Sequence, residues 1–306
     1  MTDHTLAKRT FESIGLIVIG YFLFALTDSL QKYFGAQGFS VNYIIVYCAG
    51  ASLIFSTSAI FFMKGLKGFI PRKSIKLHAL RAALMIIGSY AIVTALQMIP
   101  LAQFYGIVFS IPFLISLGAI IMFKEHPGMQ RWIAISVGFI GVWIVANPDF
   151  SNINPGILWA VLASFSIAAS SLVARKMGPG EFMPIYPFLI HAGILMVNSF
   201  FVEEYTIPSP WLITLFLCAG FCLFFAMICI TIAYTIAPLA AIPAPFQYTQ
   251  IIWGILFGYF IFNEMIDPRS IIGICIIIAS GVYLIWREYV NNKSRQRNKF
   301  RSYTRP

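Results

Sequence analysis

Long apolar segments alternate with short polar or charged ones along the whole chain of 306 residues. Because a helix that crosses the hydrocarbon core of a bilayer needs about 20 apolar residues, each long segment predicts a membrane span. The breaks between them carry Gly, Pro or clusters of charge. The ten predicted spans are 13–34, 41–63, 77–98, 101–123, 131–147, 155–175, 183–202, 211–236, 239–262 and 270–287. The joints at 98–101 and 236–239 are so short that they predict tight helical hairpins.

Composition agrees with this pattern, since 59% of the residues are hydrophobic and 10% are charged, whereas soluble domains carry about 25% charged residues. Ten spans leave about 106 residues for loops and tails. That remainder is too small for a separate soluble catalytic domain. The first apolar run is longer than the core of a signal peptide, so it predicts a retained first span. The expected fold class is an all-α integral membrane protein.

Positive charge gathers on one side of the predicted spans. All of the 21 Lys and Arg residues except Lys32 and Arg269 fall on the side that holds both termini. Since cytoplasmic loops accumulate Lys and Arg, this asymmetry predicts a bacterial inner-membrane protein with both termini in the cytoplasm. It also predicts that the basic face lies against anionic lipid and does not bind nucleic acid.

The two halves of the chain resemble each other. Pro100-Leu-Ala and Phe123-Lys-Glu return as Pro238-Leu-Ala and Phe262-Asn-Glu at a nearly constant offset. Each half holds five spans, and an odd number of crossings turns the second half upside down relative to the first. Such inverted repeats are typical of transporters with a substrate site between the halves. The expected divisions are an N-terminal tail 1–12, repeats 13–147 and 155–287, and a basic tail 288–306.

Polar side chains inside spans are costly in lipid unless they face protein or water, so they are candidates for a substrate cavity. Aromatic rings can stack on a flat organic group while amides fix its orientation. Hydrogen bonding between helices, without substrate, is the alternative reading of the same residues. The candidate cavity residues are Tyr90, Gln97, Tyr105, Phe109, Gln247, Tyr248 and Gln250.

Prolines weaken two of the spans. Pro112 in 101–123, and Pro243 with Pro245 in 239–262, each remove a backbone hydrogen bond and free a carbonyl one turn earlier. These residues predict two locally bendable helices, as alternating access requires.

Few ionisable residues lie deep in the spans. Asp28 and Lys32 are one turn apart in the first span and predict an i, i+4 ion pair that reaches toward the outer surface. The alternative for Asp28 is a gate or a proton-linked carboxylate. His191 is read either as a packing residue or as a proton-coupling group. Glu125 and Glu264 follow matching spans, where they are expected to bind loop backbone or basic residues.

Signatures of catalysis are missing from the sequence. It has neither a phosphate-binding Gly-x-x-x-x-Gly-Lys-Ser/Thr loop nor His-Glu-x-x-His or Gly-x-Ser-x-Gly. The five cysteines stand in apolar segments without metal-ligand spacing. No enzyme, cofactor or metal is therefore expected. A membrane enzyme or an assembly partner without transport activity stays as the competing class.

Several segments resemble the EamA-type transporters of the drug/metabolite transporter superfamily. In the first half these are Arg81-Ala, Phe109-Ser-Ile-Pro-Phe113, Phe123-Lys-Glu125, Arg131-Trp and Gly138-Phe-Ile-Gly-Val142. In the second half Ala244-Pro-Phe-Gln-Tyr-Thr-Gln250 is similar to the corresponding signature. The resemblance implies a ten-helix carrier of small organic metabolites, in a family whose members move amino acids, riboflavin or S-adenosylmethionine. The sequence leaves a monomer and a homodimer open.

Overall fold

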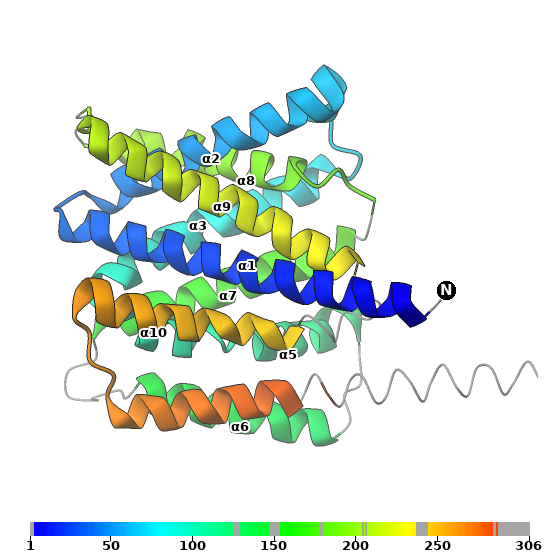
Figure 1. Ribbon diagram of the computed structural model, residues 1–306, viewed down its shortest axis with the longest axis vertical. Coiled ribbons are helices and arrows are strands. Elements are labelled where there is room, and N and C mark those ends of the chain that lie inside the picture. Colours follow the sequence, from blue (N-terminus) through cyan, green and yellow to red (C-terminus); the bar gives the residue numbers. More distant parts are fainter. Residues whose placement is uncertain are drawn as a thin grey trace, which may run out of the picture.

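The computed structural model of the chain describes residues 3–124, 129–146, 154–177, 180–203, 205, 207–236, 244–283 and 286. Within these ranges the chain forms helices and no strand. Most of the helices lie side by side, so that the ribbon in Figure 1 is a bundle with α2, α8 and α9 at one edge and α6 at the other. Several expectations fall outside the described residues: the 236–239 hairpin, Pro243, Glu125 and the basic tail 288–306.

The helices of the first half follow the predicted spans closely. They are α1 (Asp3–Ala36), α2 (Val41–Lys64), the short 3₁₀ helix η1 (Gly65–Phe69), α3 (Ile75–Met98), α4 (Leu101–Val108), α5 (Ile111–Phe123) and α6 (Met129–Ala146). Two features of these helices stand out. Most of the predicted tail 1–12 is helical, because α1 begins at Asp3 and continues into the first span. The fourth span is broken into α4 and α5.

The second half repeats this order. Its helices are α7 (Pro155–Met177), α8 (Ile185–Asn198), η2 (Ser199–Phe201), α9 (Pro210–Ile236), η3 (Ala244–Tyr248) and α10 (Thr249–Phe262), and an apolar helix Pro268–Tyr283 follows. Within the described ranges, six helices are long and apolar enough to cross a membrane, and four shorter apolar helices accompany them. Together they account for the ten predicted spans.

The packing of the helices obeys the internal repeat. In the repeat, α1 corresponds to α7 and α3 corresponds to α9. The extensive contact of α1 with α9 therefore has a counterpart in the contact of α7 with α3, and both contacts are present. The contact of α2 with α9 becomes that of α8 with α3 in the same way. The matched segments around Lys124 and Asn263 also end their helices alike, with φ of 53° and 52°. These paired contacts are what two inverted halves produce.

Glycines allow the closest approaches between the halves. Gly141 on α6 and Gly273 on the last helix bring the two backbones so close that an added Cβ on either residue would lie within 3 Å of the other's carbonyl oxygen. On α10, Gly254 provides the space in which the Tyr105 ring lies. These contacts fix α4 and α6 of the first half against the end of the second.

A buried carboxylate joins two loops at the end of the bundle that holds the N-terminus, called here the basic end. Glu181 accepts hydrogen bonds from the backbone N–H groups of Arg72 at 3.0 Å and Lys73 at 2.8 Å, and lies 3.1 Å from His78 Nε2. Burial raises the pKa of the Glu181 carboxyl, but these three partners and the Phe182 N–H, which donates to Oε1 at 3.1 Å, outweigh that effect and hold its pKa below the ordinary value. The 65–74 segment is thereby tied to the second half.

Candidate functional site

A cavity of about 520 Å³ lies between the helices of the two halves. This volume is in the range of pockets that bind small organic molecules. Its wall is mostly apolar, and on α3 it runs from Arg81 to Ile92, about 16 Å along the helix axis. At the opposite end of the bundle, called here the far end, it stops at Gln31 and Phe104. The polar and charged residues of its wall include Asp28, Gln31, Arg81, His191, Gln247 and Gln250.

Side chains from three helices meet at Asp28 on α1. The Tyr105 hydroxyl of α4 donates a hydrogen bond to Asp28 Oδ2 at 2.9 Å, and Gln250 Nε2 of α10 donates to the same oxygen at 3.3 Å. Nearby, Tyr21 donates to Gln247 Oε1 at 3.5 Å. Because α4 belongs to the first half and α10 to the second, this cluster spans the interface of the repeats.

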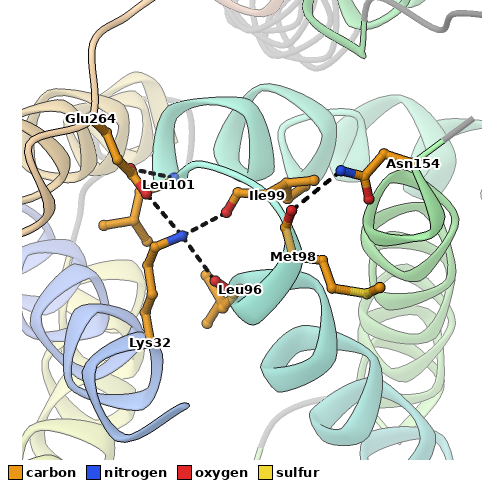
Figure 2. A network of polar contacts seen from close by, with 7 residues as sticks. All are labelled: Lys32, Leu96, Met98, Ile99, Leu101, Asn154 and Glu264. Atoms are coloured by element: carbon orange, nitrogen blue, oxygen red, sulfur yellow. Dashed lines mark hydrogen bonds and ion pairs between the residues drawn. The ribbon is translucent and has the colours of Figure 1, made fainter. Parts of the chain in front are cut away.

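Beyond the far end of the cavity lies a second polar cluster, the far-end clasp, formed by Lys32, Glu264 and the backbone of Leu96, Ile99 and Leu101 (Figure 2). Lys32 Nζ donates to the carbonyls of Leu96 at 2.9 Å and Ile99 at 2.7 Å, and pairs with Glu264 Oε1 at 2.8 Å. Glu264 Oε2 accepts from the Leu101 N–H at 2.9 Å. All three donors of the ammonium group are therefore used.

The clasp also matches the charges of the helix ends that it joins. Lys32 binds carbonyls where α3 ends, and Glu264 binds an N–H group where α4 begins, so each ion lies at the favourable end of a helix dipole. Asn154 of the second half donates to the Met98 carbonyl in the same hairpin at 3.3 Å (Figure 2). The tight 98–101 hairpin, which the sequence predicted, is thus held by two residues of the other half.

The predicted ion pair between Asp28 and Lys32 is wrong. Lys32 pairs with Glu264 instead, while Asp28 has only the neutral partners Tyr105 and Gln250 among the described residues. The physical reason is the hairpin that follows α3. Its free carbonyls and Glu264 offer the ammonium group three acceptors, which is more than one carboxylate a turn below could provide. The expectation that Glu264 binds loop backbone or a basic residue is confirmed on both counts.

The predicted cavity residues fall into two groups. Tyr105, Phe109, Gln247 and Gln250 line the cavity. The remaining three lie outside its wall, contrary to the expectation. Tyr90 packs edge-on against Trp159, with ring centroids 5.6 Å apart, and Gln97 packs against Gly35 with its side chain exposed. Tyr248 is buried against Phe109 and Gly281.

The broken fourth span has the predicted proline at its break. The α-helix ends at Val108 and restarts at Ile111, and Pro112 occupies the first turn of α5, where its missing N–H costs nothing. In the ninth span Pro245 lies in the 3₁₀ helix η3 that precedes α10.

His191 on α8 lines the cavity wall and is buried. Its Nδ1 lies 3.1 Å from the Ser52 hydroxyl of α2. Sequence reasoning did not place Tyr21, Gln31 or Arg81 in the cavity. Arg81 appeared only as part of a family segment, yet it is a charged residue two turns into a span, which is a signal that could have identified it. Its guanidinium lies over the Tyr186 ring at 4.9 Å.

Comparison with known proteins shows which proteins this chain resembles. Residues 154–287 match the profile of the EamA-like transporter family. The S-adenosylmethionine uptake transporter of Rickettsia prowazekii is 26% identical over 90% of this chain and 92% of its own length. The riboflavin transporter of Rhizobium johnstonii is 27% identical over 69% of this chain and 70% of its own. A crystal structure of a protein with 12% sequence identity shares the fold, with a TM-score of 0.60 over 90% of this chain and 96% of that one.

A bundle of apolar spans around a cavity shared by two related halves defines a polytopic membrane transporter of small metabolites. Residues 154–287 match the EamA-like transporter family, and the curated relatives named above are transporters of small metabolites, so the chain is similar to EamA-type transporters of the drug/metabolite transporter superfamily.

Proposed function

We propose that this protein is a secondary carrier that moves a small organic metabolite across the bacterial inner membrane by alternating access. The observation that carries the proposal is the cavity between the halves, whose polar cluster at Asp28 lies directly below the closed far-end clasp. A carrier needs a site that both halves build and an end that can close over it. In this conformation the clasp closes the far end.

Movement between the two conformations is expected to use the breaks near Pro112 and Pro245. At the first break the helical ladder is interrupted at Phe109 and Ser110, so α4 can change its angle while α5 keeps its contacts with α7. The break therefore separates α4, which touches the clasp, from α5, which packs against α7.

Orientation follows from charge. The basic end is proposed to face the cytoplasm and anionic lipid, because Lys and Arg accumulate there, and the far end to face the periplasm. The relatives named above carry S-adenosylmethionine and riboflavin. Both contain a flat heteroaromatic ring system, and the aromatic side chains Tyr21, Phe104 and Phe109 of the cavity wall provide faces on which such a ring can stack.

Flux into proteoliposomes tests the proposal. Purified protein is reconstituted, and the uptake of labelled S-adenosylmethionine, riboflavin and amino acids is measured against protein-free liposomes. Saturable uptake of at least one solute, competed by the unlabelled compound, supports a carrier. If the protein is folded and inserted but moves none of a broad metabolite panel, the competing class of membrane enzyme or assembly partner is favoured.

A further inference from the structure

Asp28 is an acidic residue at the wall of the cavity that has no ionic partner among the described residues. Both of its hydrogen-bond partners, the Tyr105 hydroxyl and Gln250 Nε2, donate to the single oxygen Oδ2. An ionised carboxylate accepts and does not donate, and two donors on one carboxyl oxygen are compatible with that state. The side chain is only partly covered by protein and borders the cavity.

The cations near Asp28 are engaged elsewhere. Lys32, one turn along α1, uses its three donors in the far-end clasp. The other charged or titratable residues of the wall are Arg81, His191, Cys48 and tyrosines. Arg81 lies over the Tyr186 ring near the basic end, about 16 Å along α3 from Ile92 at the other limit of the cavity wall on this helix. An ionised carboxylate in so apolar a cavity is costly unless a cation joins it.

The surroundings of Asp28 also favour a cationic guest. Phe24, one turn earlier on α1, and Tyr21 and Phe104 contribute aromatic rings to the same wall. Aromatic faces attract cations through their quadrupole, and together with a carboxylate they form sites for ammonium-type groups. Gln31, one turn beyond Asp28, has an exposed fraction of 9%, and its Oε1 accepts no hydrogen bond from the described residues. This oxygen is a second acceptor beside the carboxylate.

We infer that the transported metabolite carries a cationic centre, a sulfonium or ammonium group, that binds against the Asp28 carboxylate at the far end of the cavity. The inference rests on the proposed function, since it takes this cavity as the transport site. The inference distinguishes between the substrates of the two relatives by their charge. S-adenosylmethionine carries such a centre, whereas riboflavin is neutral and would leave the carboxylate unpaired.

Equilibrium binding to purified protein in detergent tests the inference with S-adenosylmethionine, choline, riboflavin and 5′-methylthioadenosine. The last is the neutral nucleoside thioether that shares the adenosine part of S-adenosylmethionine. The variant Asp28→Asn removes the charge and keeps an oxygen that can accept from Tyr105 and Gln250. Asp267→Asn is the matched control, because Asp267 is exposed at the far end, away from the cavity.

The wild type is expected to bind S-adenosylmethionine more tightly than 5′-methylthioadenosine. Asp28→Asn should weaken the binding of S-adenosylmethionine about tenfold or more and change that of 5′-methylthioadenosine less than about twofold. Asp267→Asn should leave both unchanged. If Asp28→Asn lowers the affinity for S-adenosylmethionine and for 5′-methylthioadenosine by equal factors, Asp28 has a packing or proton-coupling role, and the inference is overturned.

Two results distinguish the failure of this inference from the failure of the proposed carrier function. A wild-type protein that binds riboflavin, and neither of the two cationic probes, overturns the cationic substrate while the carrier function stands. Binding of a cationic probe that depends on Asp28, but without any flux in proteoliposomes, supports the inference on recognition and refutes transport. The failure of each proposal is thus recognised separately.

Discussion

Removing the charge of Glu264 is the sharpest test of the far-end clasp. In Glu264→Gln the Lys32 ammonium keeps its two carbonyl acceptors but loses its counter-ion, and the hydrogen bond to the Leu101 N–H becomes a neutral one. The side chains of Lys32 and Glu264 are 13% and 16% exposed. Their pairing therefore lies between an exposed ion pair, which contributes about 0–1 kcal/mol, and a fully buried pair, whose disruption costs about 3–5 kcal/mol.

We expect Glu264→Gln to destabilise the closed far end by about 2 kcal/mol. Such a change shifts a two-state equilibrium about 30-fold toward the open far end. The measurement is the rate at which a membrane-impermeant thiol reagent labels a cysteine introduced at Gln31 in a variant without the native cysteines. Glu203→Gln, which neutralises an exposed carboxylate at the same end, is the control.

A double-mutant cycle separates the ion pair from other effects of the substitution. The double variant Glu264→Gln/Lys32→Met should destabilise the closed far end by less than the sum of the two single changes. The difference should be at least about 1 kcal/mol, because the double variant removes both partners of the ion pair together. A coupling energy below about 0.5 kcal/mol, or labelling that is as slow as in the Glu203→Gln control, would refute the clasp as the closure of the far end.

Three further outcomes are expected. Gly254→Ala places a methyl group in the space of the Tyr105 ring and should lower the free energy of unfolding by about 1–3 kcal/mol. The control Gly15→Ala adds a methyl group that meets no atom within 4 Å, so it should be neutral or slightly stabilising. Equal thermal stability of the two variants would contradict the packing of Tyr105 against Gly254. Because the pKa of Glu181 is lowered in the folded state, its stabilisation is present at pH 7 and is lost as pH falls through that lowered pKa. The melting temperature of Glu181→Gln should therefore lie below the wild type at pH 7 and approach it below about pH 4, and a gap independent of pH would exclude the carboxylate. Reporter fusions after Arg72 and at the C-terminus should both report cytoplasm, and a periplasmic signal from either contradicts the orientation.

The spans were predictable because they depend on local properties of the chain. Hydropathy over about 20 residues decides whether a segment can cross a bilayer, whatever its neighbours are. The interruption near Pro112 follows equally from one residue and its missing N–H. These features need no knowledge of which helix lies beside which.

Side-chain partners were less predictable, since they depend on the arrangement of distant segments. Asp28 and Lys32 satisfy the i, i+4 rule, yet the better partner of Lys32 is Glu264, which only the fold brings near. Tyr90 is a polar residue in a span, but the face that it occupies turns toward Trp159 and away from the cavity. Sequence periodicity identifies a face of a helix without identifying what that face meets.

The position of α4 links the proposed substrate site to the far-end clasp. Leu101 and Tyr105 are one turn apart on this helix, the first held by Glu264 and the second hydrogen-bonded to Asp28. The helix ends three residues after Tyr105, so a change in its angle moves both contacts together. A cation that binds Asp28 competes with the Tyr105 hydroxyl for the carboxylate. Weakening of the hydrogen bond between Tyr105 and Asp28 frees α4 to change its angle, which alters the contact of Leu101 with Glu264 at the start of the helix. Coupling between two sites is reciprocal. If binding of the cation changes the equilibrium between the closed and the open clasp by some factor, opening the clasp must change the affinity for the cation by the same factor.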